Sequence, residues 1–196
     1  SQLYKARITR SGQKSFDCKN EYGQEFKAKA LGSLLKGQDS LVVGDYIFYQ
    51  KSETTDEFII KELIPRSNEI FRVIVRENKK KVTAANCDHL IILNSVSKPI
   101  LKTGIIDRFL VRAYQWGIEP IVVFNKMDQY DPSKCDVVFE SERLKSLGVS
   151  CYDISAKDIE YKNLHLELGI EDLKEKLQDK TTIFLGQSGV GKSKTI

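Results

Sequence analysis

Residues 186–193, close to the end of the chain, constrain the fold more than any other stretch. They read G-x-x-x-x-G-K-S and follow a β-branched and apolar run at residues 181–185 that is typical of a buried strand. In such a loop, glycines let backbone N–H groups surround phosphates, lysine adds positive charge and the serine hydroxyl binds Mg²⁺. The predicted phosphate site is Gly186, Gln187, Ser188, Gly189, Val190, Gly191, Lys192, Ser193 and Lys194, with Ser193 as the Mg²⁺ ligand and Lys192 catalytic by stabilising phosphate charge.

The sequence before this loop alternates short apolar runs with amphipathic segments. Strands are predicted at residues 89–93, 120–124, 149–154 and 181–185, and helices at residues 103–116, 133–147 and 171–177. The first helix places Ile106, Phe109, Leu110 and Ala113 on one face and ends at Gly117. This alternation predicts an α/β domain with a parallel sheet flanked by helices, in which ligands bind at the carboxyl ends of the strands.

Two further polar motifs follow predicted strands. They are Asn125, Lys126, Met127 and Asp128 after residues 120–124, and Ser155, Ala156 and Lys157 after residues 149–154. Guanine presents two neighbouring donors that one carboxylate can accept bidentately, which makes Asp128 the expected guanine reader. The stem of Lys126 can lie along the base, and a backbone N–H near Ala156 can donate to guanine O6. Three motifs at three strand ends predict GTP and GDP as ligands; an ATP-using protein with an accidental N-K-x-D is the alternative.

The first 68 residues show a different pattern of apolar and polar residues. Five short strands are predicted at residues 3–10, 16–19, 24–30, 45–51 and 58–63, separated by glycine-rich turns. This pattern predicts a small five-stranded oligonucleotide-binding barrel over residues 1–68, followed by a second domain over residues 69–196. The aromatic residues here are expected mostly in the core, with base stacking as the alternative role. They are Tyr4, Phe16, Tyr22, Phe26, Tyr46, Phe48, Tyr49 and Phe58.

A basic stretch lies between the two predicted domains. Its positive residues are Arg72, Arg76, Lys79, Lys80 and Lys81, and Glu77 is the acidic residue among them. Apolar residues on either side predict a hairpin with a basic tip. This tip either binds the phosphate backbone of a nucleic acid or is only a solvated turn.

Composition excludes several other classes of protein. The formal net charge of +4 permits a polyanionic partner without demanding one. No apolar run approaches the roughly 20 residues that span a bilayer, and residues 1–10 lack the apolar core of a signal peptide. The cysteines are scattered without a C-x-x-C pair, which indicates reduced thiols. We therefore expect a cytoplasmic protein with no membrane contact, and we expect it to be a monomer.

The order of the motifs makes the chain resemble a known family. In ordinary small GTPases the phosphate loop precedes the guanine motifs, whereas here it follows them. This circular permutation, residues 65–68 (P-R-S-N), residues 84–86 (A-A-N) with Asp88, and the pair Asp107 and Arg108 resemble ribosome small subunit-dependent GTPase A. The resemblance implies a barrel, a GTPase domain and a C-terminal zinc domain. It also implies GTP hydrolysis stimulated by the small (30S) ribosomal subunit, binding to its rRNA and a role in its late maturation.

The chain also departs from that family. No aspartate begins a D-x-x-G motif, and no Cys/His cluster could supply zinc ligands. Lys194 and Thr195 stand where the family has Ser and Leu. We expect these 196 residues to be part of a longer protein that holds the switches, the water-positioning residue and the zinc domain, so that hydrolysis by this part alone is impaired. A guanine-nucleotide-dependent RNA-binding module with negligible hydrolysis is the alternative. His89 and His165 are expected to be structural or exposed.

Overall fold

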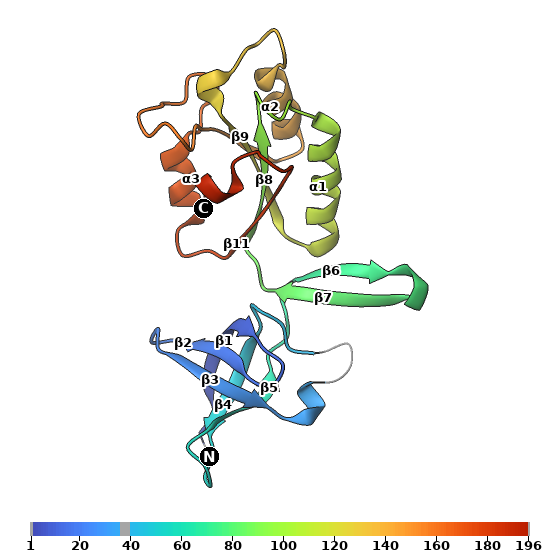
Figure 1. Cartoon of the computed structure of the whole chain (residues 1–196), viewed down its shortest axis with the longest axis vertical. Coiled ribbons are helices and arrows are strands. Elements are labelled where there is room, and N and C mark those ends of the chain that lie inside the picture. Colours follow the sequence, from blue (N-terminus) through green and yellow to red (C-terminus); the bar gives the residue numbers. More distant parts are fainter. Residues whose placement is uncertain (1, 36–39, 196) are drawn as a thin grey trace. The chain divides into compact units, whose positions relative to one another are not determined.

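A computed structural model describes residues 2–35 and 40–195, except for the side chains of residues 194 and 195. The chain divides into two compact units, Ser1–Cys87 and Asp88–Ile196. The first unit therefore contains the hairpin that follows residue 68 as well as the barrel. Figure 1 shows the barrel strands, the hairpin and the mixed helix–strand unit in chain order.

The five predicted strands of the first unit are confirmed. They are Tyr4–Ser11 (β1), Phe16–Asn20 (β2), Glu25–Ala30 (β3), Tyr46–Lys51 (β4) and Phe58–Leu63 (β5), and a short 3₁₀ turn, Gly32–Leu34, follows β3. They form a closed barrel in the order β1-β2-β3-β5-β4, in which β3 and β5 pair in parallel and the other pairs are antiparallel. Closure leaves no free sheet edge, which stabilises so small an all-β unit.

Alternating side chains of these strands fill the barrel. Ile8, Phe16, Cys18, Ile47 and Ile60 are almost fully buried. The aromatic residues divide between inside and outside: Phe16 and Tyr49 are in the core, Phe26 and Phe58 pack against it, and Tyr4 and Tyr22 are exposed. Tyr46 and Phe48 are half-buried.

A two-stranded hairpin follows the barrel within the first unit. Its strands are Glu69–Ile74 (β6) and Lys79–Ala85 (β7), and the 3₁₀ turn Val75–Glu77 joins them through Asn78, whose φ is 46°. The predicted hairpin is thus confirmed. It is fastened to the barrel by backbone pairing, since Ala85 N donates to Val43 O at 3.0 Å.

A buried ion pair holds the start of the hairpin against the barrel. Arg66 donates through Nε to Asp45 Oδ1 at 2.7 Å and through Nη2 to Asp45 Oδ2 at 2.9 Å. The same guanidinium contacts Ser40 O at 2.9 Å and Glu69 Oε1 at 3.1 Å. These carboxylates raise the pKa of Arg66, with the Asp45 hydrogen bond as the largest cause. Bidentate pairing of this kind fixes geometry as well as charge.

The second unit is a four-stranded parallel sheet with helices on both faces. Its strands are His89–Ser95 (β8), Glu119–Asn125 (β9), Ser150–Asp153 (β10) and Thr182–Gly186 (β11), in the order β10-β9-β8-β11. Its helices are Thr103–Trp116 (α1), Val137–Ser146 (α2), Ile170–Leu177 (α3) and Lys192–Thr195 (α4), and Met127–Gln129 forms a 3₁₀ turn. The predicted fold class, a barrel followed by a parallel sheet with flanking helices, is confirmed.

Each face of the sheet has its own core. Ile91, Leu93, Ile121 and Val123 point to the face that α3 covers, where Leu173 packs on them. Helices α1 and α2 lie on the opposite side of the sheet from α3 (Figure 1). The strands read as continuous apolar runs because both faces are buried. Helix α1 buries Ile106, Leu110 and Ala113, as its periodicity predicts, and ends at Gly117 with φ 67°.

The predicted start of α2 at residue 133 was wrong. The helix begins at Val137, because the Asp136 side chain accepts a hydrogen bond from Phe139 N at 2.9 Å and caps it. The residues before it form a turn in which Ser133 N and Oγ both donate to Asp131 Oδ1. Short polar side chains that bind nearby backbone favour such turns over helix.

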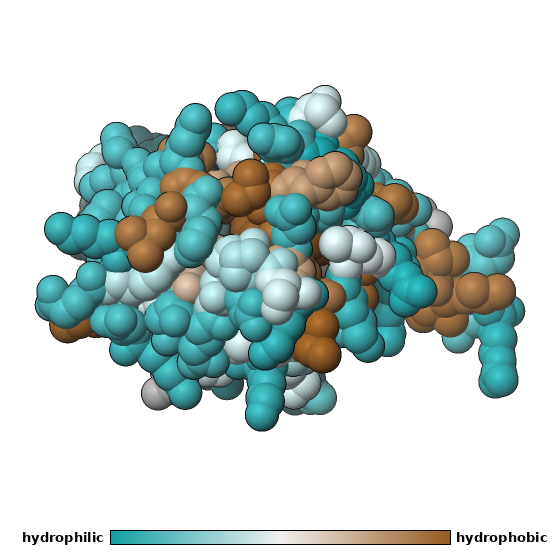
Figure 2. All heavy atoms as spheres, turned by 90° about the horizontal axis from the view of Figure 1, so that it is seen from above, coloured by the Kyte–Doolittle hydropathy of each residue, from teal (hydrophilic) through white to brown (hydrophobic). Residues whose placement is uncertain are grey.

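In Figure 2 one face of the molecule is mostly hydrophilic, with apolar residues in small separate groups. Among the described residues, no helix combines the length and the apolar character that crossing a bilayer requires.

Candidate nucleotide-binding site

The three predicted motifs follow the carboxyl ends of three parallel strands. The phosphate loop follows β11, the N-K-x-D residues begin at the last residue of β9, and Ser155–Lys157 comes just after β10. All strands of the β10-β9-β8-β11 sheet run in one direction, so that their carboxyl ends lie together at the same end of the sheet. Ligands of open α/β sheets bind at the carboxyl ends of the strands.

Asn125 joins the three motifs directly. Its side chain is 2% exposed, and its Nδ2 donates to Val190 O in the phosphate loop at 2.9 Å. Its Oδ1 accepts a hydrogen bond from Ala156 N at 2.9 Å. One amide thus connects two segments that follow it in the sequence by 31 and 65 residues. Sequence reasoning placed Asn125 in the site without identifying this bridging role.

Lys126 and Asp128 make further contacts between the motifs. Lys126 has a left-handed backbone, with φ 63°, and its Nζ donates to Gly189 O at 2.8 Å and to Lys98 O. Asp128 is exposed, and its Oδ1 accepts a hydrogen bond from Ser155 Oγ at 2.6 Å. Between them Met127 is buried, and its backbone N donates to Ile154 O at 3.1 Å. The Asp128 carboxylate is therefore oriented at the surface by a hydroxyl from the neighbouring strand end.

Glycine is required where the phosphate loop contacts other segments. A Cβ on Gly191, whose φ is 100°, would lie 2.4 Å from Asn125 Nδ2, and a Cβ on Gly186 would lie 2.5 Å from Leu93 O. Val190 fastens the loop to the sheet, because its side chain is 1% exposed in the core beneath α3. The motif glycines thus serve close packing as well as backbone freedom.

Lys192 folds back on its own loop. Its Nζ donates to Gly186 O and Gln187 O, each at 2.9 Å. Ser188 and Ser193 are exposed, whereas Gln187 is half-buried. Within the described part of the chain, the backbone nitrogens of Ser188, Gly189 and Val190 make no hydrogen bond. These N–H groups, the Lys192 ammonium and the Ser193 hydroxyl suit a nucleotide's phosphates and its Mg²⁺ ion. The Lys194 side chain lies outside the described residues.

A buried carboxylate that the sequence analysis missed organises the loop after Ser155. Asp153, 1% exposed, accepts hydrogen bonds from Tyr161 Oη at 2.7 Å and from His165 N at 2.9 Å. Burial, and then the hydrogen bond to Asp153, raises the pKa of Tyr161. His165 also packs edge-on against Tyr130, two residues beyond Asp128. The loop that contains Ala156 and Lys157 is thus tied to the end of β10 and to the segment after Asp128.

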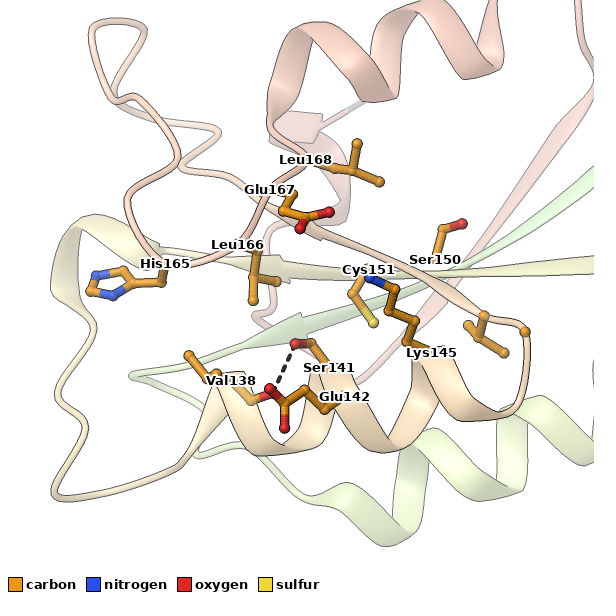
Figure 3. Close-up of a pocket in the computed structure, with 12 residues that line it drawn as sticks. Val138, Ser141, Glu142, Lys145, Ser150, Cys151, His165, Leu166, Glu167 and Leu168 are labelled. Atoms are coloured by element: carbon orange, nitrogen blue, oxygen red, sulfur yellow. Dashed lines mark hydrogen bonds between the residues drawn. The ribbon is translucent and has the colours of Figure 1, made fainter.

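A separate cavity of about 440 Å³ lies between α2, β10 and residues 165–168. Figure 3 shows Cys151 and Lys145 projecting into the space between α2 and the segment that carries Leu166 and Leu168. None of the residues of the three nucleotide motifs lines it. Burial raises the pKa of the Cys151 thiol to about 12, so that the thiol stays protonated at neutral pH. We therefore assign this cavity no part in nucleotide binding.

Among the described residues, no group of three or more His, Cys, Asp or Glu side chains could hold a metal ion. His89, 5% exposed at the start of β8, lies with Nδ1 3.2 Å from Glu119 Oε2. It lies at the end of the sheet opposite the three motifs.

The basic hairpin residues are partly neutralised. Lys80 pairs with Glu69 and lies 4.4 Å above the Phe71 ring, and Lys79 lies 3.7 Å from Glu77. The sequence suggested Glu77 as the opposing acid, and the structure adds Glu69 from the partner strand. Arg72 and Lys81 face each other across the hairpin, and Arg76 lies near its tip. Within the described residues, these three cations have no ion pair.

Comparison with known proteins agrees with this arrangement. The RsgA GTPase family profile matches residues 63–196. A "Small ribosomal subunit biogenesis GTPase RsgA" from Flavobacterium psychrophilum is 34% identical over 163 residues, covering 81% of this chain and 48% of that protein. The protein of the same name from Saccharophagus degradans is 36% identical over 163 residues, covering 80% of this chain and 44% of that protein. The chain thus spans about half the length of these relatives.

Solved structures match nearly the whole chain. YjeQ from Thermotoga maritima superposes with a TM-score of 0.78 and 29% identity, covering 99% of this chain and 64% of that one. YloQ, described as a circularly permuted GTPase, gives a TM-score of 0.76 at 28% identity, covering 98% of this chain and 63% of that one. With the permuted order of its motifs and a profile match over most of its length, this chain belongs to the RsgA GTPase family.

Proposed function

We propose that this chain binds GTP and GDP and hydrolyses GTP as a cytoplasmic factor in late maturation of the small ribosomal subunit. The observation that supports the proposal is the bridging of all three motifs by Asn125, which brings the proposed base and phosphate contacts together at the carboxyl ends of the strands. The relatives' printed name, a small ribosomal subunit biogenesis GTPase, supports the biological role.

Recognition of the base rests on Asp128. The Ser155 hydroxyl holds one of its carboxylate oxygens, and the side chain remains exposed at the strand end. Both carboxylate oxygens can accept from the guanine N1–H and 2-amino groups, a charge-assisted pair that adenine cannot offer. The half-buried Lys126 side chain, fastened to Gly189 O, provides an apolar stem beside that position.

Hydrolysis rests on positioning and charge. Lys192 Nζ, which now contacts two loop carbonyls, would turn to the β- and γ-phosphates, and the free N–H groups of residues 188–190 would donate to phosphate oxygens. Ser193 would hold Mg²⁺, which neutralises charge that develops during phosphoryl transfer. Phosphoryl transfer requires little beyond such positioning and electrostatic stabilisation.

The guanine assignment is tested by Asp128→Asn. We expect weaker binding of GDP and GTP and a gain for xanthine nucleotides, whose 2-oxo group prefers a donor. Titration of fluorescent nucleotides against both proteins measures this, and Asp131→Asn is the matched control because it removes the same charge from an exposed turn nearby. If ATP competes as well as GTP for the unmutated protein, the assignment is wrong. Phosphate release with and without small subunits then measures hydrolysis.

Contact with rRNA forms the second part of the proposal. Arg72 and Lys81 lie directly opposite each other, and like charges so placed repel unless a polyanion lies between them. Replacement of Lys79, Lys80 and Lys81 together by Ala should weaken cosedimentation with small subunits and flatten its salt dependence, with nucleotide binding unchanged. Identical salt curves for parent and triple variant would mean that the hairpin is only solvated.

A further inference from the structure

The loop that follows β10 is built around a carboxylate that the proposed nucleotide contacts leave unused. Asp153 is the last residue of β10, and its side chain is 1% exposed. Its Oδ1 accepts a hydrogen bond from Tyr161 Oη at 2.7 Å, and its Oδ2 accepts from the backbone nitrogens of His165 and Leu166 at 2.9 and 3.2 Å. One buried group thus binds residues 8, 12 and 13 positions further along the chain. We name these four residues the Asp153 clasp.

Hydrogen bonds to Asp153, rather than apolar packing, hold the middle of this loop. Ile159 is 92% exposed and Leu164 is 77% exposed, so these side chains contribute almost no burial. The loop is closed at its far end, where Asp153 N donates to Leu168 O at 2.9 Å and Leu168 packs against the core that α3 covers. A compact surface loop with so little apolar burial depends on its internal polar contacts. The Asp153 clasp therefore determines the conformation of residues 156–166.

The clasp begins two residues before the side chain that orients Asp128. Ser155 Oγ donates to Asp128 Oδ1 at 2.6 Å. Between Asp153 and Ser155, the carbonyl oxygen of Ile154 accepts a hydrogen bond from Met127 N at 3.1 Å. Displacement of the clasped loop would therefore move the hydroxyl that sets the direction of the Asp128 carboxylate.

A second contact joins the clasp to the segment that follows Asp128. The His165 ring lies edge-on to the Tyr130 ring, with 4.8 Å between the ring centres. Tyr130 is also fixed from its other end, because its Oη accepts a hydrogen bond from Val137 N, at the start of α2, at 3.1 Å. Edge-to-face aromatic contacts are directional, so they restrain orientation as well as distance. Both contacts between the Asp128 segment and the loop thus depend on the Asp153 clasp.

From these contacts we infer that Asp153 is a positioning residue for guanine recognition, which acts through Ser155 on Asp128. The clasped loop holds the Asp128 carboxylate in the direction that accepts from both the N1–H and the 2-amino group of guanine. A bidentate contact requires this direction, and a group that is ordered before the ligand arrives costs little further ordering on binding. The inference deepens the proposed nucleotide binding and rests on it.

The test measures how well each protein distinguishes guanine from hypoxanthine, which keeps the N1–H but lacks the 2-amino group. Competition of GDP and of inosine diphosphate against a fluorescent GDP analogue gives the ratio of their two Kd values. The parent should bind GDP about tenfold or more tightly, since the missing hydrogen bond is one to a charged group. Asp153→Ala should lower this ratio by about threefold or more, because the released loop no longer directs Asp128. A role in folding alone would weaken both nucleotides equally and leave the ratio unchanged.

Two conservative variants separate hydrogen bonding from charge. Asp153→Asn should keep most of the parent's ratio, because its Oδ1 can accept from both backbone nitrogens while its Nδ2 donates to Tyr161 Oη. Tyr161→Phe keeps the carboxylate and the aromatic ring but removes one of the three donors, so it should lower the ratio by less than Asp153→Ala does.

Glu140→Ala is the matched control. It removes another buried carboxylate of the same unit, which is 3% exposed on α2 and pairs with Arg143 at 2.6 Å. This variant should be less stable in urea but should keep the parent's ratio of Kd values. A lowered ratio would overturn the inference, because the site would then respond to the loss of any buried carboxylate.

The remaining outcomes also decide the inference. An unchanged ratio in Asp153→Ala would limit the clasp to folding, and equal losses in Asp153→Asn and Asp153→Ala would show that charge, not hydrogen bonding, is responsible. If circular dichroism shows that Asp153→Ala is unfolded, Tyr161→Phe decides, and an unchanged ratio there overturns the inference. A parent that binds inosine diphosphate as tightly as GDP, but ADP more weakly, would have no bidentate contact to position. If the parent binds ADP as tightly as GDP, the proposed function itself fails.

Discussion

The bridge made by Asn125 predicts that one substitution damages both stability and nucleotide binding. Asn125→Ala removes two hydrogen bonds of 2.9 Å from a side chain that is 2% exposed. Each such bond contributes about 0.5–1.5 kcal/mol net, and a partner left unsatisfied in a buried place costs about 1–3 kcal/mol. We therefore expect the free energy of unfolding to fall by about 2–4 kcal/mol.

The same change should weaken nucleotide binding beyond its effect on folding. Without the amide, the phosphate loop and the turn at Ala156 lose their direct connection, so that binding must order both segments. A penalty of about 1.4 kcal/mol corresponds to a tenfold rise in Kd. Urea unfolding measures the first effect, and titration with fluorescent GDP, under conditions where both proteins are folded, measures the second.

Asn94→Ala provides the matched control. Asn94 is 7% exposed at the end of β8, and its Nδ2 donates to Ile92 O at 3.0 Å and Val123 O at 3.4 Å, both within the sheet. This change should also lower stability but should leave Kd for GDP nearly unaltered. The reasoning is refuted if Asn125→Ala keeps the parent's Kd within about twofold, or if Asn94→Ala weakens binding as much.

Two further predictions concern groups outside the nucleotide site. Arg66→Ala should lower the free energy of unfolding of the barrel unit by about 3–5 kcal/mol, because it leaves the fully buried Asp45 carboxylate without its cation. Lys51→Ala breaks an exposed ion pair and should have little effect in the same urea assay; similar losses in the two variants would contradict this. Burial raises the pKa of Cys151 from 9.0 to about 12, so the protonated thiol favours the folded state below pH 9 and this contribution is lost as pH rises towards 12. Iodoacetamide at pH 9 should accordingly modify Cys151 far more slowly in the native chain than in urea, and equal rates by peptide mass mapping would show that the thiol is accessible.

Much of the fold could be predicted from the sequence because its local signals agree with its packing. The apolar face of α1 and the stop at Gly117 gave the helix its correct bounds, and alternating residues identified the barrel strands. The start of α2 was missed because the side chains of Asp131 and Asp136 bind nearby backbone N–H groups, which delays the helix to Val137.

The nucleotide motifs could be found from the sequence, but not the contacts that hold them together. Residue spacing shows that Asn125 follows a strand; it does not show that β9 lies next to β10 with the phosphate loop within reach. Asp153 was missed for a similar reason, since an aspartate at a strand end is ordinary until Tyr161 and His165 fold back upon it. Both roles depend on tertiary neighbours distant in sequence.

The position of β11 in the sheet has a consequence for how the protein is made. Synthesis proceeds from the N-terminus, so β8, β9 and β10 leave the ribosome before β11, although β11 pairs with β8. The proposed base-binding segments are therefore synthesised before the proposed phosphate-binding loop, and one edge of the growing sheet stays open until β11 pairs with β8. Under the proposed function, a nascent copy gains its complete nucleotide site only after that pairing, so that GTP would be a late ligand of the new chain rather than a template for its folding.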